Sequence, residues 1–239
     1  MSISTKPQGP VENRLLASLP NEVFARLLPH LQRVSFALGG VVYESSERME
    51  RLYFPTTCIV SLLYTMTDGA TAEMGLVGND GVVGIALFMG GNTVPNRAVA
   101  QVAGDAFSAP APVLLEEFRR GGTCQLLLLR YTQALITLIS QTAVCNRLHS
   151  VEQRLCRWLL LTHDRVGSAE LLLTQEFIAN MLGGRRESVT RAARRLQQAG
   201  LIRYVRGHIT ILDRQGLEAA SCECYQVVKT EFDRLLGVR

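Results

Sequence analysis

Arginine side chains are concentrated in one short segment of this chain. Between Arg185 and Arg206 there are seven arginines and a single acidic residue, Glu187, so the segment carries six net positive charges, whereas the whole chain of 239 residues carries +4. The other residues are therefore slightly acidic in sum. A positive charge concentrated in this way is the pattern expected of a surface that binds a polyanion such as a nucleic acid.

Two helices separated by a glycine pair are predicted around these arginines. Thr174 can cap the first helix, because its hydroxyl can accept a hydrogen bond from an amide of the first turn. Four apolar residues then recur at helical spacing: Phe177, Ile178, Met181 and Leu182. Gly183 and Gly184 permit the left-handed backbone that ends one helix and directs the next, which is predicted from about Arg185 to Ala199. This arrangement is typical of a helix-turn-helix.

The second of these helices has two distinct faces. At about 100° per residue, an arc of about 140° holds Arg186, Glu187, Thr190, Arg191 and Arg194. The opposite side holds Val189, Ala192, Ala193 and Leu196. An isolated arginine-rich helix is about as often a solvated basic face as a binding surface. Here the capped helix and the glycine turn before it favour a recognition helix.

After Gly200 the apolar pattern changes from helical spacing to alternation. The segment Leu201–Leu212 contains two β-rich runs on either side of Gly207, which predicts a β-hairpin. A hairpin beside a recognition helix can contact phosphate groups, and the basic residues on this one are Arg203, Arg206 and His208. The local fold predicted for the carboxy-terminal region is a winged helix-turn-helix.

The segment Gly183–Arg191, together with Leu196–Ile202 and the hairpin, resembles the DNA-binding domain of the Crp/Fnr superfamily of bacterial transcription regulators. In that family an Arg-Glu pair opens the recognition helix and an Arg follows one turn later, and these positions are matched by Arg186, Glu187 and Arg191. A guanidinium group can bond in a fork to guanine, and a carboxylate can accept from cytosine in the major groove. The resemblance therefore implies a palindromic site with TGA-like half-sites.

The resemblance extends over most of the chain. Arg185 departs from it, because the family often has Ser at the start of this helix; a side-chain N-cap is lost there and a phosphate contact can be gained. The full set of candidate DNA-binding residues is Arg185, Arg186, Glu187, Ser188, Thr190, Arg191, Arg194, Arg203 and Arg206.

The amino-terminal half changes in character along its length. Helical segments are predicted around Glu12 to Leu31, and short β-rich runs separated by Gly, Pro, Asn and Asp follow from about Val34 to Pro110. Many short strands at this spacing predict a sandwich or a jelly roll. The resemblance selects the double-stranded β-helix of the cyclic-nucleotide-binding type. The expected fold class is α+β, with a jelly-roll sensor domain, a long dimerisation helix and a carboxy-terminal winged helix-turn-helix domain.

The region Leu76–Val102 aligns with the effector-binding part of that family and departs from its best-known members. Their phosphate-binding cassette has Gly-Glu-Leu and, further on, Arg-Ser or Arg-Thr, whereas this chain has Gly84-Ile85-Ala86 and Arg97-Ala98. Only Arg97 keeps the cassette's chemistry, so cyclic nucleotide binding is not expected. Gly84 and Arg97 are the candidate effector-binding residues, and a surface or interdomain salt bridge is the competing interpretation for Arg97.

Cysteines and histidines give few cofactor signals. Six cysteines without a secretory segment indicate a reducing compartment and mostly free, buried thiols. No cysteine precedes Cys58, so the amino-terminal cluster of the family's iron-sulfur members is absent. Cys222 and Cys224 form a single Cys-x-Cys with no partner pair nearby in sequence, the four histidines are scattered, and no covalent haem motif occurs. We therefore expect no metal site and no cofactor, while a noncovalently bound haem stays open.

A long helix is predicted between the two regions, from about Gln125 to Asn146. Along it, side chains that suit a paired helix recur every three or four positions: Leu128, Tyr131, Leu135, Leu138, Thr142 and Cys145. In the resembled family this helix pairs with its copy, which implies a homodimer whose recognition helices lie about 34 Å apart. The alternative is that the leucines cover the β-roll of their own subunit.

The boundaries of the expected units follow from the helix signals. Ser150 and Gln153 form a Ser-x-x-Gln capping box, so a new helix starts there and a linker is predicted at about Arg147 to His149. The expected division is residues 1–123 for the amino-terminal helices and β-roll, 124–149 for the dimerisation helix and hinge, and 150–239 for the winged domain with a helical extension. In that extension a last amphipathic helix is predicted from the spacing of Tyr225, Val228, Phe232 and Leu235. We expect it to pack on the winged domain or its linker.

Signals of a membrane protein or an enzyme are not found in the sequence. Met1 to Pro10 is polar, and no apolar run approaches the about 20 residues that a membrane span requires, so a cytoplasmic protein is expected. No Ser-His-Asp set, paired-carboxylate motif or phosphate loop occurs in a recognisable context, so an enzyme is not expected.

The leading hypothesis is a dimeric, sequence-specific transcription regulator that binds double-stranded DNA. Its β-roll would sense an unidentified signal, and it would contact RNA polymerase if it is an activator. Two other classes stay open: a cyclic-nucleotide or small-molecule binding module, and a thiol or metal sensor centred on Cys222 and Cys224, each acting through a protein partner.

Overall fold

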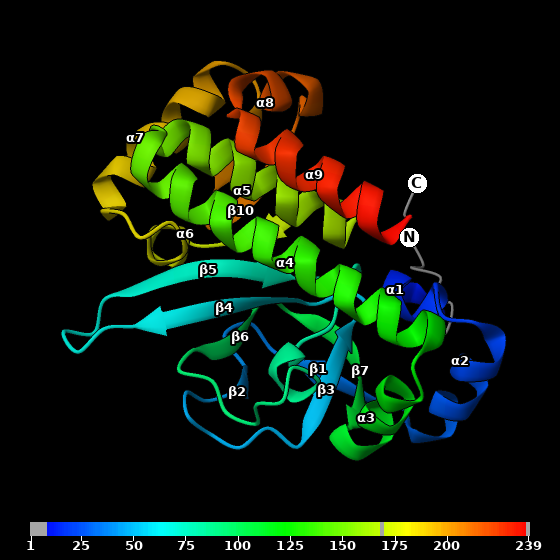
Figure 1. The fold of residues 1–239 in the computed structure, drawn as a ribbon. Coiled ribbons are helices and arrows are strands. Elements are labelled where there is room, and N and C mark those ends of the chain that lie inside the picture. The colour runs from blue at the N-terminus through cyan, green and yellow to red at the C-terminus, as the bar shows by residue number, and fades with distance from the viewer. Residues whose placement is uncertain (1–8, 168–169, 238–239) are drawn as a thin grey trace, which may run out of the picture.

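A computed structural model describes residues 9–167 and 170–237 of the chain. It consists of a β-roll, a long helix that crosses the roll, and a layer of helices on the other side of that helix (Figure 1). Residues 1–8, 168–169 and 238–239 lie outside the described part, and with them the outer ends of the expected units and most of the polar segment from Met1 to Pro10. Short helices precede the first strand, where the sequence predicts helices: η1 (Pro10–Glu12), α1 (Arg14–Ala17), α2 (Asn21–Leu27) and η2 (Leu28–His30).

The β-roll is a sandwich of two antiparallel sheets, ordered β1-β7-β3 and β2-β6-β4-β5. Its core lies between the sheets, where Leu52, Phe54 and Ile59 are at most 1% exposed. The mixed fold with a β-rich amino-terminal part is confirmed. Its elements are β1 (Gln32–Phe36), β2 (Val41–Tyr43), β3 (Arg51–Pro55), β4 (Ile59–Thr65), β5 (Thr71–Val77), η3 (Ile85–Leu87), β6 (Arg97–Val102) and β7 (Gly104–Pro110).

The chain leaves the roll through α3 (Ala111–Arg120) and enters α4 (Gly122–Leu148), the predicted long helix. Gly121 and Gly122 make the bend between them, with φ of 78° and 69°, which glycine adopts without steric strain. One side of α4 packs closely on β5, since a Cβ at Gly75 would lie 3.0 Å from Leu138. None of the described helices, α4 included, combines the length and the apolar character needed to cross a membrane.

The carboxy-terminal region starts with α5 (Val151–Val166), which begins at the predicted capping box. The Ser150 hydroxyl accepts from the N–H of Gln153 (3.3 Å), and the Gln153 side chain accepts from the N–H of Ser150 (3.1 Å). The linker is shorter than predicted, because α4 continues to Leu148. A sheet ordered β8-β10-β9 and three helices follow: β8 (Glu170–Leu172), α6 (Gln175–Met181), α7 (Arg186–Gln198), β9 (Ile202–Val205), β10 (His208–Ile211) and α8 (Arg214–Ala220).

The last helix, α9 (Glu223–Leu236), lies alongside α4 (Figure 1). It packs on α5 of the winged region, as predicted, and more extensively on α4, which was not predicted. The Tyr131 ring of α4 meets the Phe232 ring of α9 edge-on, with 6.5 Å between centroids. The four apolar side chains that predicted this helix are all buried: Tyr225, Val228, Phe232 and Leu235.

Candidate nucleic-acid interface

The first helix of the predicted motif is α6, and it begins where the sequence indicates. The Thr174 hydroxyl accepts a hydrogen bond from the N–H of Phe177 (3.1 Å) and so satisfies an otherwise free amide of the first turn. Its inner side is buried through Ile178, Ala179 and Met181. Because α6 packs against both α7 and β5, the motif is held on the rest of the molecule.

The turn and the second helix also follow the prediction. Gly183 has a φ of 56°, in the left-handed region, and α7 begins three residues later at Arg186. Arg185 occupies the N-cap position and makes no side-chain cap there, as expected for arginine in place of serine. The predicted inner face of α7 is at most 4% exposed: Val189, Ala192, Ala193 and Leu196. The small alanine side chains allow α5 and α6 to approach α7 closely.

The opposite face of α7 is exposed and basic. Exposed side chains on it or at its start are Arg185, Arg186, Glu187, Arg191 and Arg194, while Ser188 and Thr190 are half-buried. Within residues 9–167 and 170–237, these four arginines have no carboxylate oxygen within 4.0 Å. Their neighbour Arg195 does pair, with Glu152 at 3.4 Å. Unpaired guanidinium groups keep their donors available for an incoming anion.

Gln175, the first residue of α6, was not among the predicted site residues. It lines a hollow in this face together with Arg186, Glu187, Thr190, Arg191 and Arg194. The hydroxyl of Thr190 donates to the Gln175 side chain (2.7 Å) and lies 2.9 Å from the carbonyl oxygen of Arg186. Thr190 therefore serves contacts within the subunit, unlike the free arginines. Gln175 directly follows Thr174, the N-cap of α6. Its place at the start of this helix was the signal that could have identified it as a site residue.

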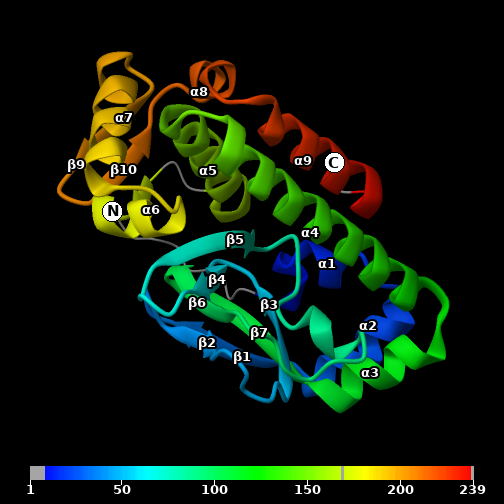
Figure 2. The ribbon, with the colours of Figure 1, turned by 60° about the vertical axis from the view of Figure 1, so that its left-hand side comes forward.

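The predicted wing is the hairpin of β9 and β10. Arg206 and Gly207 both have positive φ (49° and 83°), the pattern of a two-residue type I′ turn. Arg203, Arg206 and His208 are exposed. The Tyr204 hydroxyl donates to a main-chain carbonyl just before α6, that of Leu173 (2.9 Å), and so fixes the wing beside the motif. Figure 2 shows the hairpin and α7 together at one outer edge of the molecule, far from α3.

The two candidate effector-binding residues do not share a site. Gly84, with a φ of 106°, lines an apolar cavity of about 220 Å³ inside the roll, next to Leu135 and Ile139 of α4. Arg97 is not part of that lining. Its guanidinium forms an ion pair at 3.0 Å with Glu44, whose side chain is 53% exposed, so the surface salt bridge is the arrangement found.

The six side chains expected at the dimer interface are buried inside the subunit. None is more than 8% exposed: Leu128, Tyr131, Leu135, Leu138, Thr142 and Cys145. Because α4 packs on β5 and α9, these side chains are not free to contact a partner. The alternative, that the leucines cover the β-roll of their own subunit, fits Leu135 and Leu138, which pack against Gly75 of β5. The exposed side of α4 carries another series at spacings of three and four: Leu126, Leu129, Gln133, Ile136, Ser140 and Val144.

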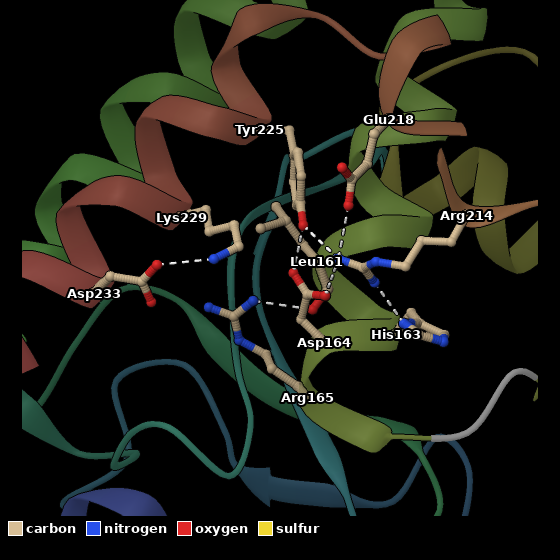
Figure 3. Close-up of polar contacts among 9 residues, drawn as sticks. All are labelled: Leu161, His163, Asp164, Arg165, Arg214, Glu218, Tyr225, Lys229 and Asp233. Carbon is tan, nitrogen blue, oxygen red and sulfur yellow. Dashed lines mark hydrogen bonds and ion pairs between the residues drawn. The ribbon is translucent and has the colours of Figure 1, made fainter. Parts of the chain in front are cut away.

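A network of charged and polar side chains joins α5, α8 and α9 (Figure 3). Arg214 pairs with Asp164 (2.7 Å) and with Glu218 (3.0 Å). It also donates to the Tyr225 hydroxyl (2.8 Å), which itself donates to Asp164 (2.9 Å). Burial, followed by the Asp164 charge, raises the pKa of Tyr225, so this phenol stays protonated and remains a donor. The three helices are therefore fixed to one another by a closed set of polar contacts.

Arg165 connects the helical layer to the β-roll. Its side chain is 4% exposed, pairs with Asp80 at 2.8 Å and lies 5.1 Å from the centre of the Phe232 ring. The close approach requires glycine at position 78, because a Cβ on Gly78 would lie 2.6 Å from the Arg165 side chain. The Arg165 side chain of α5 thus contacts both the β-roll and α9.

Cys222 and Cys224 do not stand alone in the structure. Ligand atoms of Cys145, His149, Cys222 and Cys224 all lie within 4.8 Å of one another. This group was not predicted, because its two halves are far apart in the chain. The available signal was the separation of four residues between Cys145 and His149, which places both on one face of a helix.

Comparisons with known proteins agree with this architecture. Residues 153–220 match the family model of the Crp-like helix-turn-helix domain. FixK2 from Bradyrhizobium japonicum has a similar structure, with a TM-score of 0.69 and 18% identity over 80% of this chain and 98% of that chain. The c-di-GMP responsive global regulator CLP from Xanthomonas campestris has a TM-score of 0.63 and 17% identity, covering 81% and 100%. A Crp/Fnr-family transcriptional regulator from Thermus thermophilus has a TM-score of 0.61 and 22% identity, covering 80% and 98%. No curated protein matches the chain in sequence.

Proposed function

We propose that this chain is a sequence-specific DNA-binding transcription regulator, because a Crp-like helix-turn-helix domain matches it and its fold is similar to that of Crp/Fnr transcription regulators. The observation that carries the proposal is the surface shared by α7 and the wing. Apart from Arg195, which pairs with Glu152, its exposed guanidinium groups have no carboxylate partner within the described part of the chain. A protein surface with this excess of free cations suits the phosphate backbone of DNA. The proposed activity is binding, and no reaction is part of it.

In this proposal α7 lies in the major groove. Arg186 and Arg191 donate in a fork to guanine and Glu187 accepts from cytosine, each pair contributing about 1–3 kcal/mol of discrimination. These contacts read a TGA-like half-site. Arg203 and Arg206 of the wing bind phosphate groups, as do Arg185, Ser188 and Arg194 at the rim of the helix, and such contacts position the protein without reading sequence.

Two copies pair through the exposed side of α4. Apolar side chains on that side are between 43% and 70% exposed in the single chain: Leu126, Leu129, Ile136, Val144 and Leu148. Together with the polar Gln133 and Ser140, these positions recur at spacings of three and four, as in the seam of a helix pair. A twofold dimer of this kind places two recognition helices about 34 Å apart and so reads a palindrome.

The signal acts on the β-roll of the expected amino-terminal unit, residues 1–123, and passes through the dimerisation helix and hinge, residues 124–149, to the DNA-binding unit, residues 150–239. The roll's cavity touches Leu135 and Ile139 of α4, so its occupant contacts the helix that couples the units. An effector shifts the arrangement only if it binds one arrangement better than another. A cyclic nucleotide is not favoured, because Arg97, the one cassette cation, is engaged with Glu44.

The proposed partners follow from the DNA target. The chromosome of a bacterium lies in its cytoplasm, so the protein acts there and needs no membrane. If it activates transcription, it also contacts RNA polymerase. No resident cofactor is required for the DNA contacts described above.

Selection of bound fragments from genomic DNA tests the proposal. We expect the recovered fragments to share a palindromic motif, and a duplex with that motif to bind at least about a thousandfold more tightly than a scrambled duplex at the same salt concentration. The Arg186→Ala variant serves as the matched control for base reading. Equal affinity for both duplexes, or fragments with no common motif, would reject sequence-specific binding.

A further inference from the structure

Three cysteines and one histidine meet where α4, the hinge and α9 come together. Cys145 is in the last turn of α4, His149 caps its end, and Cys222 and Cys224 stand at the start of α9. The three cysteines are at most 5% exposed, and the His149 side chain is 14% exposed. Two pairs of neighbouring residues, from segments 77 positions apart, thus surround one buried point.

Two distances within this cluster are close to those of a tetrahedral metal site, and all four ligand atoms lie within 4.8 Å of one another. Cys145 Sγ lies 3.5 Å from Cys222 Sγ, and Cys224 Sγ lies 3.6 Å from His149 Nδ1. Metal–sulfur and metal–nitrogen bonds of about 2.3 and 2.0–2.1 Å at a tetrahedral angle separate two sulfurs by about 3.8 Å and a sulfur and a nitrogen by about 3.6 Å. The cysteine sulfurs are too far apart for a disulfide, in which they would be about 2.05 Å apart.

His149 is oriented as a metal ligand usually is. Its Nδ1 faces Cys224, and its other ring nitrogen, Nε2, lies 3.3 Å from the carboxylate of Glu223. A carboxylate on the far nitrogen fixes the tautomer that leaves the near nitrogen free to bind a metal.

The charge around the cluster favours a bound anionic complex. Arg157 is 5% exposed, donates to the Thr142 hydroxyl (2.8 Å) and leaves its Nε without a partner. Among the described residues no carboxylate lies within 4.0 Å of its guanidinium. The buried carboxyl of Glu73 makes hydrogen bonds to Ser61 and Trp158 and does not pair with Arg157.

A divalent ion with three thiolates and a neutral imidazole has a net charge of about −1, which balances one buried arginine. Arg157 lies beside the cluster, because the Thr142 hydroxyl to which it donates stands three residues before Cys145 on α4.

We propose that Cys145, Cys222 and Cys224, through their sulfurs, and His149, through Nδ1, bind a divalent metal ion of the zinc class. Three thiolates and one imidazole are the donors that zinc prefers, and four protein ligands leave no open position, so the site is structural. Each thiol gives its proton to solvent as it binds the ion. The ion ties the start of α9 to the hinge between α4 and α5, and this role is independent of DNA binding.

Metal analysis of the full-length protein, purified without oxygen, tests the site. We expect about one zinc ion per chain in the wild type, and loss of the ion or at least about hundredfold weaker binding in Cys145→Ser, Cys222→Ser, Cys224→Ser and His149→Gln. Cys124→Ser is the matched control, because Cys124 is equally buried on α4 and lies outside the cluster, and it should retain the ion. Glu223→Gln should weaken binding about tenfold, since only the support of His149 is lost.

Cobalt titration of the wild-type apoprotein keeps the test valid even if the cysteine variants fail to fold. Co²⁺ alone should produce the intense visible and near-ultraviolet bands of a tetrahedral cobalt–thiolate complex, and Zn²⁺ should abolish them. The proposal is overturned if the wild type neither retains zinc nor gives these bands, if the cluster variants bind as well as Cys124→Ser does, or if Cys145 and Cys222 form a disulfide in the oxygen-free protein.

Discussion

The indole nitrogen of Trp158 donates a hydrogen bond to a carboxyl oxygen of Glu73 over 3.0 Å, and this bond joins α5 to strand β5 of the β-roll. The two residues are 2% and 4% exposed. The Ser61 hydroxyl donates to the other carboxyl oxygen (2.5 Å). Burial raises the pKa of Glu73 to about 7, although the hydrogen bonds from Ser61 and Trp158 lower it. The contact between the roll and the helical layer therefore contains a group that titrates near neutral pH.

We expect the stability of the protein to fall as pH rises toward neutrality because of Glu73. Its folded-state pKa lies above the ordinary value of 4.5, so its contribution is fully present below about pH 4.5 and is lost as pH rises through about 7. At 1.36 kcal/mol per pKa unit, the change is on the order of 3 kcal/mol. Denaturant unfolding at several pH values between about 5 and 8 measures it.

The Glu73→Gln variant should flatten this pH dependence, because an amide imitates the protonated carboxyl and still accepts from Trp158. Glu50→Gln, at an exposed position, should leave the dependence as in the wild type. Identical pH profiles for wild type and Glu73→Gln would show that Glu73 remains ionised in the folded protein.

Removing a base-reading side chain should lower specificity. We expect Arg186→Ala and Glu187→Ala each to lose about 1–3 kcal/mol of preference at one base step, because a fork to guanine or an acceptor for cytosine disappears. Competition between the selected duplex and a series of single-base variants measures the preference. Arg119→Ala, an exposed arginine on α3, is the control, and a specificity ratio unchanged by either substitution in α7 would argue against base reading.

Removing a wing cation should act on every duplex alike. We expect Arg203→Ala to weaken binding to specific and scrambled DNA by similar factors and to reduce the slope of log affinity against log salt by about 1. Affinities at several salt concentrations measure both effects. A loss confined to the specific duplex would mean that the wing reads bases.

A charge on the exposed side of α4 should separate the proposed dimer. Ile136 is 51% exposed, and Ile136→Glu would place like charges opposite each other at the seam. We expect the Ile136→Glu variant to sediment as a monomer and to bind the palindromic duplex more weakly than the wild type does. Val11→Glu, at another exposed apolar residue, should remain dimeric; a dimer in both variants would place the interface elsewhere.

The stability of the protein should depend on the Thr174 cap at the start of α6. Thr174→Ala removes the acceptor for the Phe177 amide and should lower the free energy of unfolding by about 1 kcal/mol. Thr174→Ser keeps a hydroxyl and should retain most of the stability. Denaturant unfolding of the three proteins distinguishes these outcomes, and equal stability for Thr174→Ala and wild type would mean that the cap contributes nothing measurable.

The sequence alone was enough to predict the elements whose signals are local. The cap at Thr174, the left-handed Gly183, the buried face of α7 and the capping box at Ser150 each depend on residues a few positions apart, so their physical causes are visible in one short segment. Free arginines could also be foreseen, because an excess of seven arginines over one acid in the segment leaves most of them without a local partner.

Only the tertiary structure decided which side of α4 is covered, where α9 lies, and which residues surround Cys222. The α4 pattern has apolar residues on more than one side, and periodicity cannot tell a side that meets β5 and α9 from one that meets a partner. Cys145 and Cys222 are 77 residues apart, and Glu73 and Trp158 are 85 apart. Such contacts depend on how whole helices and strands pack to bury their apolar surfaces. The residues next to a side chain in sequence do not determine which distant residues it contacts.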